Sequence, residues 1–186
     1  MKKTIFFAFF TLFFVGCSTP NVVNLPANRA ISDSVAVNMY VYIGQVADKR
    51  EDMQVAGVIK NADGSANEYV MYSQNLASWV KGALSNELKR RNLGVTDDKS
   101  AADATIDVSI NKCESTLVGF DRENLKGECE IFYAIKRGNT TYTKRVAQSQ
   151  SEFKIIKNAE AFTPFSQNLL RDVIEKSANL ISQTLK

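Results

Sequence analysis

Chemically reactive side chains are scarce in this sequence of 186 residues, and its three cysteines are the ones whose positions suggest chemistry. Histidine is absent, which removes the commonest general base near neutral pH and the commonest metal ligand. The sequence holds no nucleophile-elbow motif, glycine-rich phosphate loop or paired metal motif. We therefore expect no enzymatic activity, no metal and no cofactor; an enzyme using Asp97 and Asp98, or Glu128 and Glu130, is the alternative.

The first cysteine, Cys17, comes shortly after an apolar segment at the start of the chain. Lys2 and Lys3 precede an apolar and aromatic run at residues 5–15, an order that is typical of a secretory signal peptide. These eleven residues fall short of the roughly 20 that a membrane-spanning helix needs. We expect residues 1–16 to be a signal peptide and no permanent transmembrane helix, with a buried N-terminal helix as the alternative.

The residues around this cysteine, Phe14-Val15-Gly16-Cys17, resemble the lipobox of bacterial lipoproteins. The resemblance implies that the Cys17 sulfur becomes a diacylglyceryl thioether, that the signal is cut just before it, and that three acyl chains anchor the mature protein. Ser18 at the next position then implies the outer membrane, with the protein facing the periplasm. Phe14 replaces the usual leucine and Val15 the usual small residue, and a free or structural cysteine is the alternative.

The mature chain is close to electrically neutral. Without Lys2 and Lys3 the 23 basic residues become 21, against 20 acidic residues. Such a balance gives no strong attraction for nucleic acid, so we expect no nucleic-acid partner. Residues 17–34 contain two prolines and no sustained periodicity, and we interpret them as the lipidated cysteine and a flexible tether. Residues 35–186 then form a single domain.

Hydrophobic periodicity indicates the secondary structure of this domain. Alternating apolar residues predict strands at residues 35–43, 54–60, 68–72, 104–113, 128–136 and 140–153. Helical spacing predicts one helix at residues 74–91, capped by Ser73, and a second that starts at Pro164, after a Thr163 cap, and runs to the C-terminus. Because sequential strands with short connections pair antiparallel, we expect an α+β fold: an antiparallel sheet of about four to five strands with two amphipathic helices packed on one face.

Three stretches of the domain look like the YajG-type family of bacterial outer-membrane lipoproteins. They are VYIGQVADKR at residues 41–50 with Gly57 soon after, LKRRNLG at residues 88–94, and ATIDVS at residues 104–109. The similarity spans nearly the whole mature domain and includes the lipobox. It implies a small outer-membrane lipoprotein with no assigned enzymatic activity.

Asp48 and Arg50 follow the first predicted strand and form an Asp-x-Arg motif. This spacing places a carboxylate and a guanidinium on the same side, where they pair and satisfy loop amides. The alternative is a contact with an anion or a partner protein through Arg50.

Cys113 and Cys129 lie on strands that we expect to be neighbours, and the periplasm allows a disulfide between them. One register opposes the two thiols and also places Lys112 against Glu130. A one-residue slip separates them, and the sequence leaves the register open. We favour the disulfide, as a structural crosslink.

Two functions follow from this sequence. The first is a non-enzymatic periplasmic binding or scaffolding module, held at the outer membrane by its N-terminal lipid, whose partner is another envelope protein. Strand edges, or the face with Tyr40 and Tyr42, would make that contact. The alternative is a periplasmic carrier or sensor of an apolar ligand, held between the helices and the sheet. A pocket of a few hundred cubic ångströms between those layers favours the carrier, and a solid core favours the scaffold.

Overall fold

The computed structural model describes residues 21–29, 31, 37, 39–119, 123–155 and 158–186. The predicted signal peptide and Cys17 lie outside the described residues. The elements in chain order are β1 (Val22–Val23), β2 (Met39–Asp48), β3 (Val55–Lys60), β4 (Ala66–Tyr72), α1 (Leu76–Lys89), β5 (Leu93–Val95), a short 3-10 helix (Lys99–Ala101), β6 (Ala104–Val118), β7 (Leu125–Arg137), β8 (Thr140–Glu152) and α2 (Ala159–Leu185). In this part of the chain, no helix is long and apolar enough to cross a membrane.

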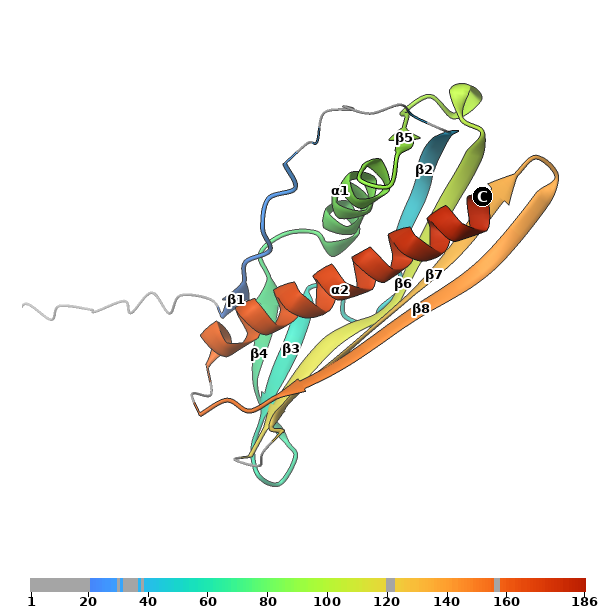
Figure 1. Cartoon of the computed structure of the whole chain (residues 1–186). Helices are drawn as coiled ribbons and strands as arrows, with labels where there is room; N and C mark the ends of the chain where they lie inside the picture. Colours follow the sequence, from blue (N-terminus) through green and yellow to red (C-terminus); the bar gives the residue numbers. More distant parts are fainter. Residues whose placement is uncertain (1–20, 30, 32–36, 38, 120–122, 156–157) are drawn as a thin grey trace, which may run out of the picture.

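The strands form one eight-stranded mixed sheet built around the long strand β6 (Figure 1). Along one edge of β6, β7 pairs antiparallel from end to end, and β8 pairs in the same way with β7. Along the other edge, β2 and then β3 both run parallel to β6. The antiparallel β3–β4 hairpin continues the sheet, and the short strands β1 and β5 add parallel edges to β4 and β2.

The expected antiparallel sheet of four to five strands is therefore wrong, although an α+β class is consistent with the structure. Neighbours in sequence pair antiparallel as predicted, because short turns join β3 to β4, β6 to β7 and β7 to β8. Parallel pairs need a long crossover between the strands. β2 and β3 both precede α1 in the chain, and β6 follows it. The segment that includes α1 is therefore the crossover, and the parallel pairs join strands that are distant in sequence.

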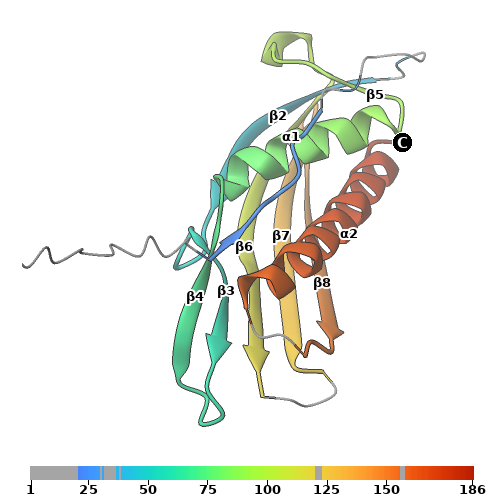
Figure 2. The ribbon, with the colours of Figure 1, turned by 90° about the vertical axis from the view of Figure 1, so that its left-hand side faces the viewer.

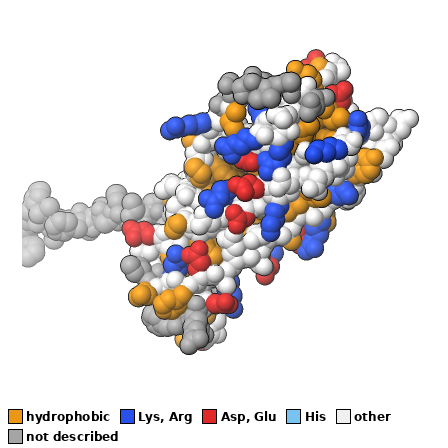
Figure 3. All heavy atoms as spheres, viewed as in Figure 1, with side chains coloured by type: hydrophobic (Ala, Val, Ile, Leu, Met, Phe, Trp, Pro, Cys, Tyr) orange, Lys and Arg blue, Asp and Glu red, His pale blue; other side chains and the backbone are white. Residues whose placement is uncertain are grey.

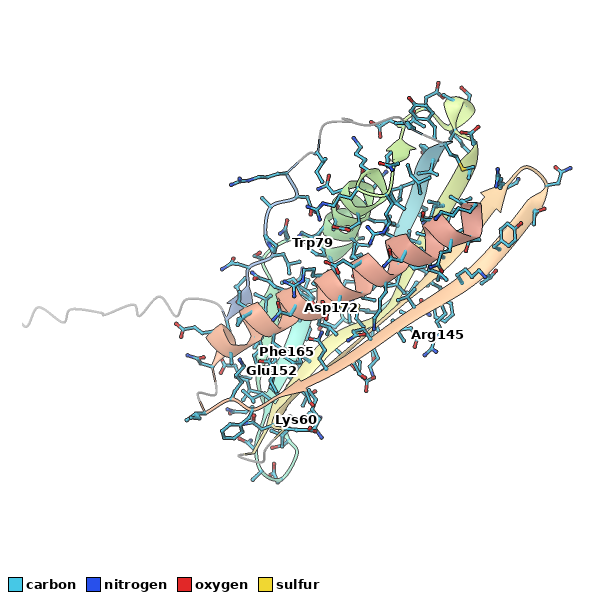
Figure 4. The ribbon with its side chains drawn as sticks, viewed as in Figure 1. Lys60, Trp79, Arg145, Glu152, Phe165 and Asp172 are labelled. Carbon is cyan, nitrogen blue, oxygen red and sulfur yellow. The ribbon has the colours of Figure 1, made fainter. Side chains whose placement is uncertain are left out.

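Both helices lie on the same face of the sheet (Figure 2). The buried side chains of β6 and β7 alternate along each strand and point toward these helices, as period-two burial requires. The contact is closest at two glycines of the sheet. A Cβ built on Gly57 would lie 2.5 Å from Cε1 of Phe162, and one on Gly127 would lie 2.5 Å from Cε1 of Phe165, which Figure 4 labels on α2. The two phenylalanine rings therefore fill the space that the missing side chains leave.

Both helices begin at residues other than those predicted. The N-cap of α1 is Asn75, not Ser73, and its Oδ1 accepts a hydrogen bond of 2.8 Å from the backbone N–H of Ser78. The second helix begins at Ala159 rather than Pro164, and its N-cap is Asn158. Burial of Phe162 on the sheet favours this earlier start, and Pro164 gives up one backbone hydrogen bond inside the helix.

Residues 21–29, within the range expected to be a flexible tether, lie against the domain. The segment passes along α1 after β1 (Figures 1 and 2). The indole N–H of Trp79 donates to the carbonyl of Pro26 at 2.8 Å, and the Asn28 amide donates to the carbonyl of Trp79 at 2.8 Å. Leu25 is buried. Residues 21–29 therefore belong to the folded domain.

Candidate functional site

The parallel edge of β6 is divided between two strands. β2 pairs with β6 as far as Asp48, opposite Ile110, and β3 resumes the pairing at Gly57, opposite Ser115. Residues 49–54 leave the sheet between these points. The four β6 residues 111–114 consequently have neither β2 nor β3 beside them. We call this interruption the split.

The guanidinium of Arg50 fills the split. Its Nε and Nη2 donate to the two carboxylate oxygens of Asp48 at 2.9 and 2.8 Å. Its Nη1 donates to the carbonyl of Val55 at 2.7 Å and to the carbonyl of Cys113 on β6 at 3.0 Å. Nη2 also donates to the carbonyl of Met53. All five N–H groups of the guanidinium thus donate to oxygen atoms of this chain. One side chain thereby joins the end of β2, the start of β3 and the middle of β6.

This ion pair is buried and charged. Only 6% of the Arg50 side chain and 5% of the Asp48 side chain are exposed. Burial by itself lowers the pKa of Arg50, but the hydrogen bonds and negative charge of Asp48 outweigh it, and the pKa is raised. The Tyr72 ring lies 5.4 Å from the guanidinium carbon, close enough for a cation–π contact. The pairing of Asp48 with Arg50 is what the Asp-x-Arg motif predicted, and a partner contact through Arg50 stays a prediction.

Cys113 and Cys129 lie directly opposite each other on β6 and β7. Of the two registers that the sequence left open, this is the one that opposes the two thiols. A bulge between Ile110 and Lys112 shifts the rest of the ladder, so Ile110 lies opposite Ile131. Both thiols are free and buried in the structure. A hydrogen bond with Cys113 and burial raise the pKa of Cys129, which disfavours a reactive thiolate. The disulfide in an oxidising compartment stays a prediction.

A groove of about 770 Å³ lies over the split, and Arg50 and Cys113 form part of its wall. Strands β3, β4 and β6 contribute most of the rest of the wall, and their lining residues include side chains that face away from the core. Tyr69 is 58% exposed there. Charged side chains of both signs also line the groove: Glu51, Asp52, Lys60, Lys112 and Glu114. We call this feature the outer groove.

Ion pairs occupy the neighbouring part of this sheet face. Lys112 lies 2.8 Å from a Glu128 oxygen, and the hydrogen bond to Glu128 is the largest cause of its raised pKa. Arg145 lies 2.7 Å from Glu130 and projects from β8 (Figure 4). Glu128 and Glu130 are therefore each paired with a cation. Asp98 instead caps the 3-10 helix by accepting from the N–H of Ser100.

Within the described ranges, no group of three or more histidine, cysteine, aspartate or glutamate side chains is placed to hold a metal ion. The outer groove was not predicted from the sequence, because it depends on pairing between distant strands. The aromatic face expected around Tyr40 and Tyr42 is only partly accessible: Tyr40 is exposed, whereas Tyr42 is half-buried.

The comparisons with known proteins support the fold alone. No protein-family model matches the sequence, and no curated protein matches it. Protein XCC0632 from Xanthomonas campestris, of family DUF330, is similar in structure, with a TM-score of 0.61, 9% identity, and coverage of 88% of this chain and 97% of that chain. An uncharacterized protein is similar with a TM-score of 0.56, 12% identity, and coverage of 90% of this chain and 99% of that one.

Structures named as bacterial lipoproteins also match. Rare lipoprotein B from Shewanella oneidensis has a TM-score of 0.42 and 10% identity, and covers 69% of this chain and 92% of its own. At this TM-score the likeness carries no argument about the present chain. The resemblance to the YajG-type family is not confirmed by these comparisons.

Replacing Arg50 by alanine removes the group that fills the split and leaves the Asp48 carboxylate buried without its cation, although the backbone N–H of residue 50 still donates to it. Breaking a buried ion pair in this way costs about 3–5 kcal/mol, so we expect the free energy of unfolding in urea to fall by that amount. The control is Arg145→Ala, which breaks an exposed pair and should leave the unfolding midpoint nearly unchanged. Equal stability of the Arg50→Ala variant and the wild type would contradict a structural role for Arg50.

Proposed function

We propose that this protein is a bacterial lipoprotein, anchored through acylated Cys17 to the periplasmic face of the outer membrane, that binds another envelope protein through the outer groove and catalyses no reaction. The anchor is supported by the sequence around Cys17. The binding role is supported by the structure of the domain, in which one sheet face is covered by helices and the other carries an open, chemically mixed groove.

The observation that carries this proposal is the contrast between the two faces of the sheet. On the helix side, Phe162 and Phe165 are fully buried and contact the sheet at Gly57 and Gly127, where not even a Cβ fits without a shift. This close contact favours a scaffold over a carrier that stores an apolar ligand between the layers. On the other side, the groove offers about 770 Å³ of space and an exposed aromatic ring.

The chemistry of the outer groove suits a polypeptide segment. Tyr69 supplies a large, amphipathic contact surface, which is typical of protein interfaces. Lys60, Lys112, Glu51 and Asp52 line the groove and supply charges of both signs for a polar rim. A highly charged ligand such as nucleic acid would instead meet carboxylates next to the lysines.

Cys17→Ser tests the anchor. We expect a fatty-acid label to enter the wild-type protein in bacterial cells and to be absent from the Cys17→Ser variant, because the sulfur atom is the site at which the diacylglyceryl group is attached. Cys113→Ser is the matched control and should keep the label, since that thiol is buried. The label should sediment with outer-membrane fractions. Equal labelling of wild type and Cys17→Ser, or none in the wild type, would contradict the anchor.

Photo-crosslinking in intact cells tests the binding surface. We expect a benzophenone amino acid in place of Tyr69 to form a discrete adduct with one envelope protein, because this position is 58% exposed within the groove. The matched control places the same amino acid at Tyr40, which is 47% exposed and lies outside the groove. Adducts at Tyr40 but not at Tyr69 would refute the outer groove as the binding surface.

A further inference from the structure

Two large apolar side chains protrude where β8 leads into α2. Phe153 is 51% exposed and Ile155 is 75% exposed, the latter the most exposed of the large hydrophobic side chains that the structure describes. In Figure 3, hydrophobic side chains gather at this lower-left end of the molecule. We call Phe153, Lys154 and Ile155 the apolar tip. Contiguous exposed apolar side chains are typical of surfaces that contact a protein or a membrane.

A buried polar group holds the apolar tip in place. The Asn124 side chain accepts from the backbone N–H of Lys154 at 2.7 Å and donates to the carbonyl of the same residue at 2.7 Å. Asn124 is only 4% exposed, and its backbone carbonyl accepts from the N–H of Val118. Because the backbone at Lys154 is fixed from within, the two apolar side chains on either side of it stay presented to the outside.

The length of chain before the domain determines how near this tip lies to a membrane. Only residues 18–20 separate Cys17 from Asn21, whose carbonyl accepts from the N–H of Met71 on β4. Four residue steps reach at most about 14 Å. An acyl-anchored Cys17 therefore keeps Asn21 within about 14 Å of the bilayer surface.

Residues 21–29 and the apolar tip both lie near the N-terminal end of α2. The Gln167 side chain of α2 donates to the carbonyl of Asn24 at 2.6 Å, just after β1. Gln167 lies eight residues after the start of α2 at Ala159, which corresponds to about 12 Å along a helix axis. Three residues lie between Ile155 and that helix start. β1 and the first part of α2 lie together in Figures 1 and 2.

We propose that the apolar tip inserts into the lipid interface beside the acyl anchor and thereby fixes how the domain stands on the membrane; this inference rests on the proposed acylation of Cys17. The charged group within the apolar tip is paired, because the Lys154 ammonium lies 2.7 Å from Glu152. Insertion of a phenylalanine and an isoleucine adds apolar burial to that of the acyl chains. The β7–β8 turn then lies at the end of the molecule farther from the bilayer.

Fluorescence of an introduced tryptophan tests this orientation. Ile155→Trp places the probe in the apolar tip. Tyr142→Trp is the matched control, because Tyr142 is exposed and lies about 33 Å along β8 from Glu152, the strand residue just before the tip. Each full-length variant is purified from membranes, its acylated mass is verified, and it is reconstituted into phosphatidylethanolamine and phosphatidylglycerol vesicles with brominated lipid tails. The wild type supplies the background from Trp79, the single tryptophan of the chain.

We expect the emission of the probe at position 155 to shift to the blue in vesicles, because its surroundings become apolar, and to be quenched by the brominated tails. The probe at position 142 should show neither change. An acylated, membrane-bound protein whose position-155 probe is quenched no more than its position-142 probe would overturn insertion while leaving the anchor intact. A protein that carries no acyl mass would overturn the proposed function, and the inference with it.

Discussion

One buried guanidinium holds together the two parts of the parallel edge. β6 is long enough for two shorter strands to run beside it in succession, and the chain between them must leave the sheet. Around that departure, Arg50 donates to the carbonyls of Met53, Val55 and Cys113 while it pairs with Asp48. Unsatisfied buried carbonyls are costly, so the interrupted edge depends on this one side chain.

The split also explains why the two faces of the sheet differ. On the helix side, the rings of Phe162 and Phe165 pack against Gly57 and Gly127, next to the split. They fill the space between the helices and the sheet there. On the opposite side, the missing strand residues leave a hollow, and the side chains around it are polar except for a few such as Tyr69 and Val58. The same interruption of β6 pairing therefore creates the candidate binding surface.

The sequence predicts those parts of the fold whose signals are local. Alternation along β6, β7 and β8 predicts three strands, and the short turns between them predict antiparallel pairing. Parallel pairing of β2 and β3 with β6 has no local signal, because the partners are tens of residues apart. The same limit applies to the outer groove. The Asp48–Arg50 pair is predictable from its spacing, whereas the Arg50 contact with Cys113, 63 residues away, is not. Residues 21–29 resemble a linker in composition, yet their carbonyls meet donors from α1 that only the folded domain supplies.

Hydrogen exchange resolved by peptide, comparing the wild type with Arg50→Lys, tests the role of the split most directly. Lysine keeps the positive charge but offers three donors in place of five, so it cannot hold all the groups that Arg50 joins. We expect faster exchange in peptides from the end of β2, from β3 and from the middle of β6, with the β7–β8 pairing unchanged. Unaltered exchange around residues 48–57 and 111–115, or an equal increase throughout the domain, would contradict it.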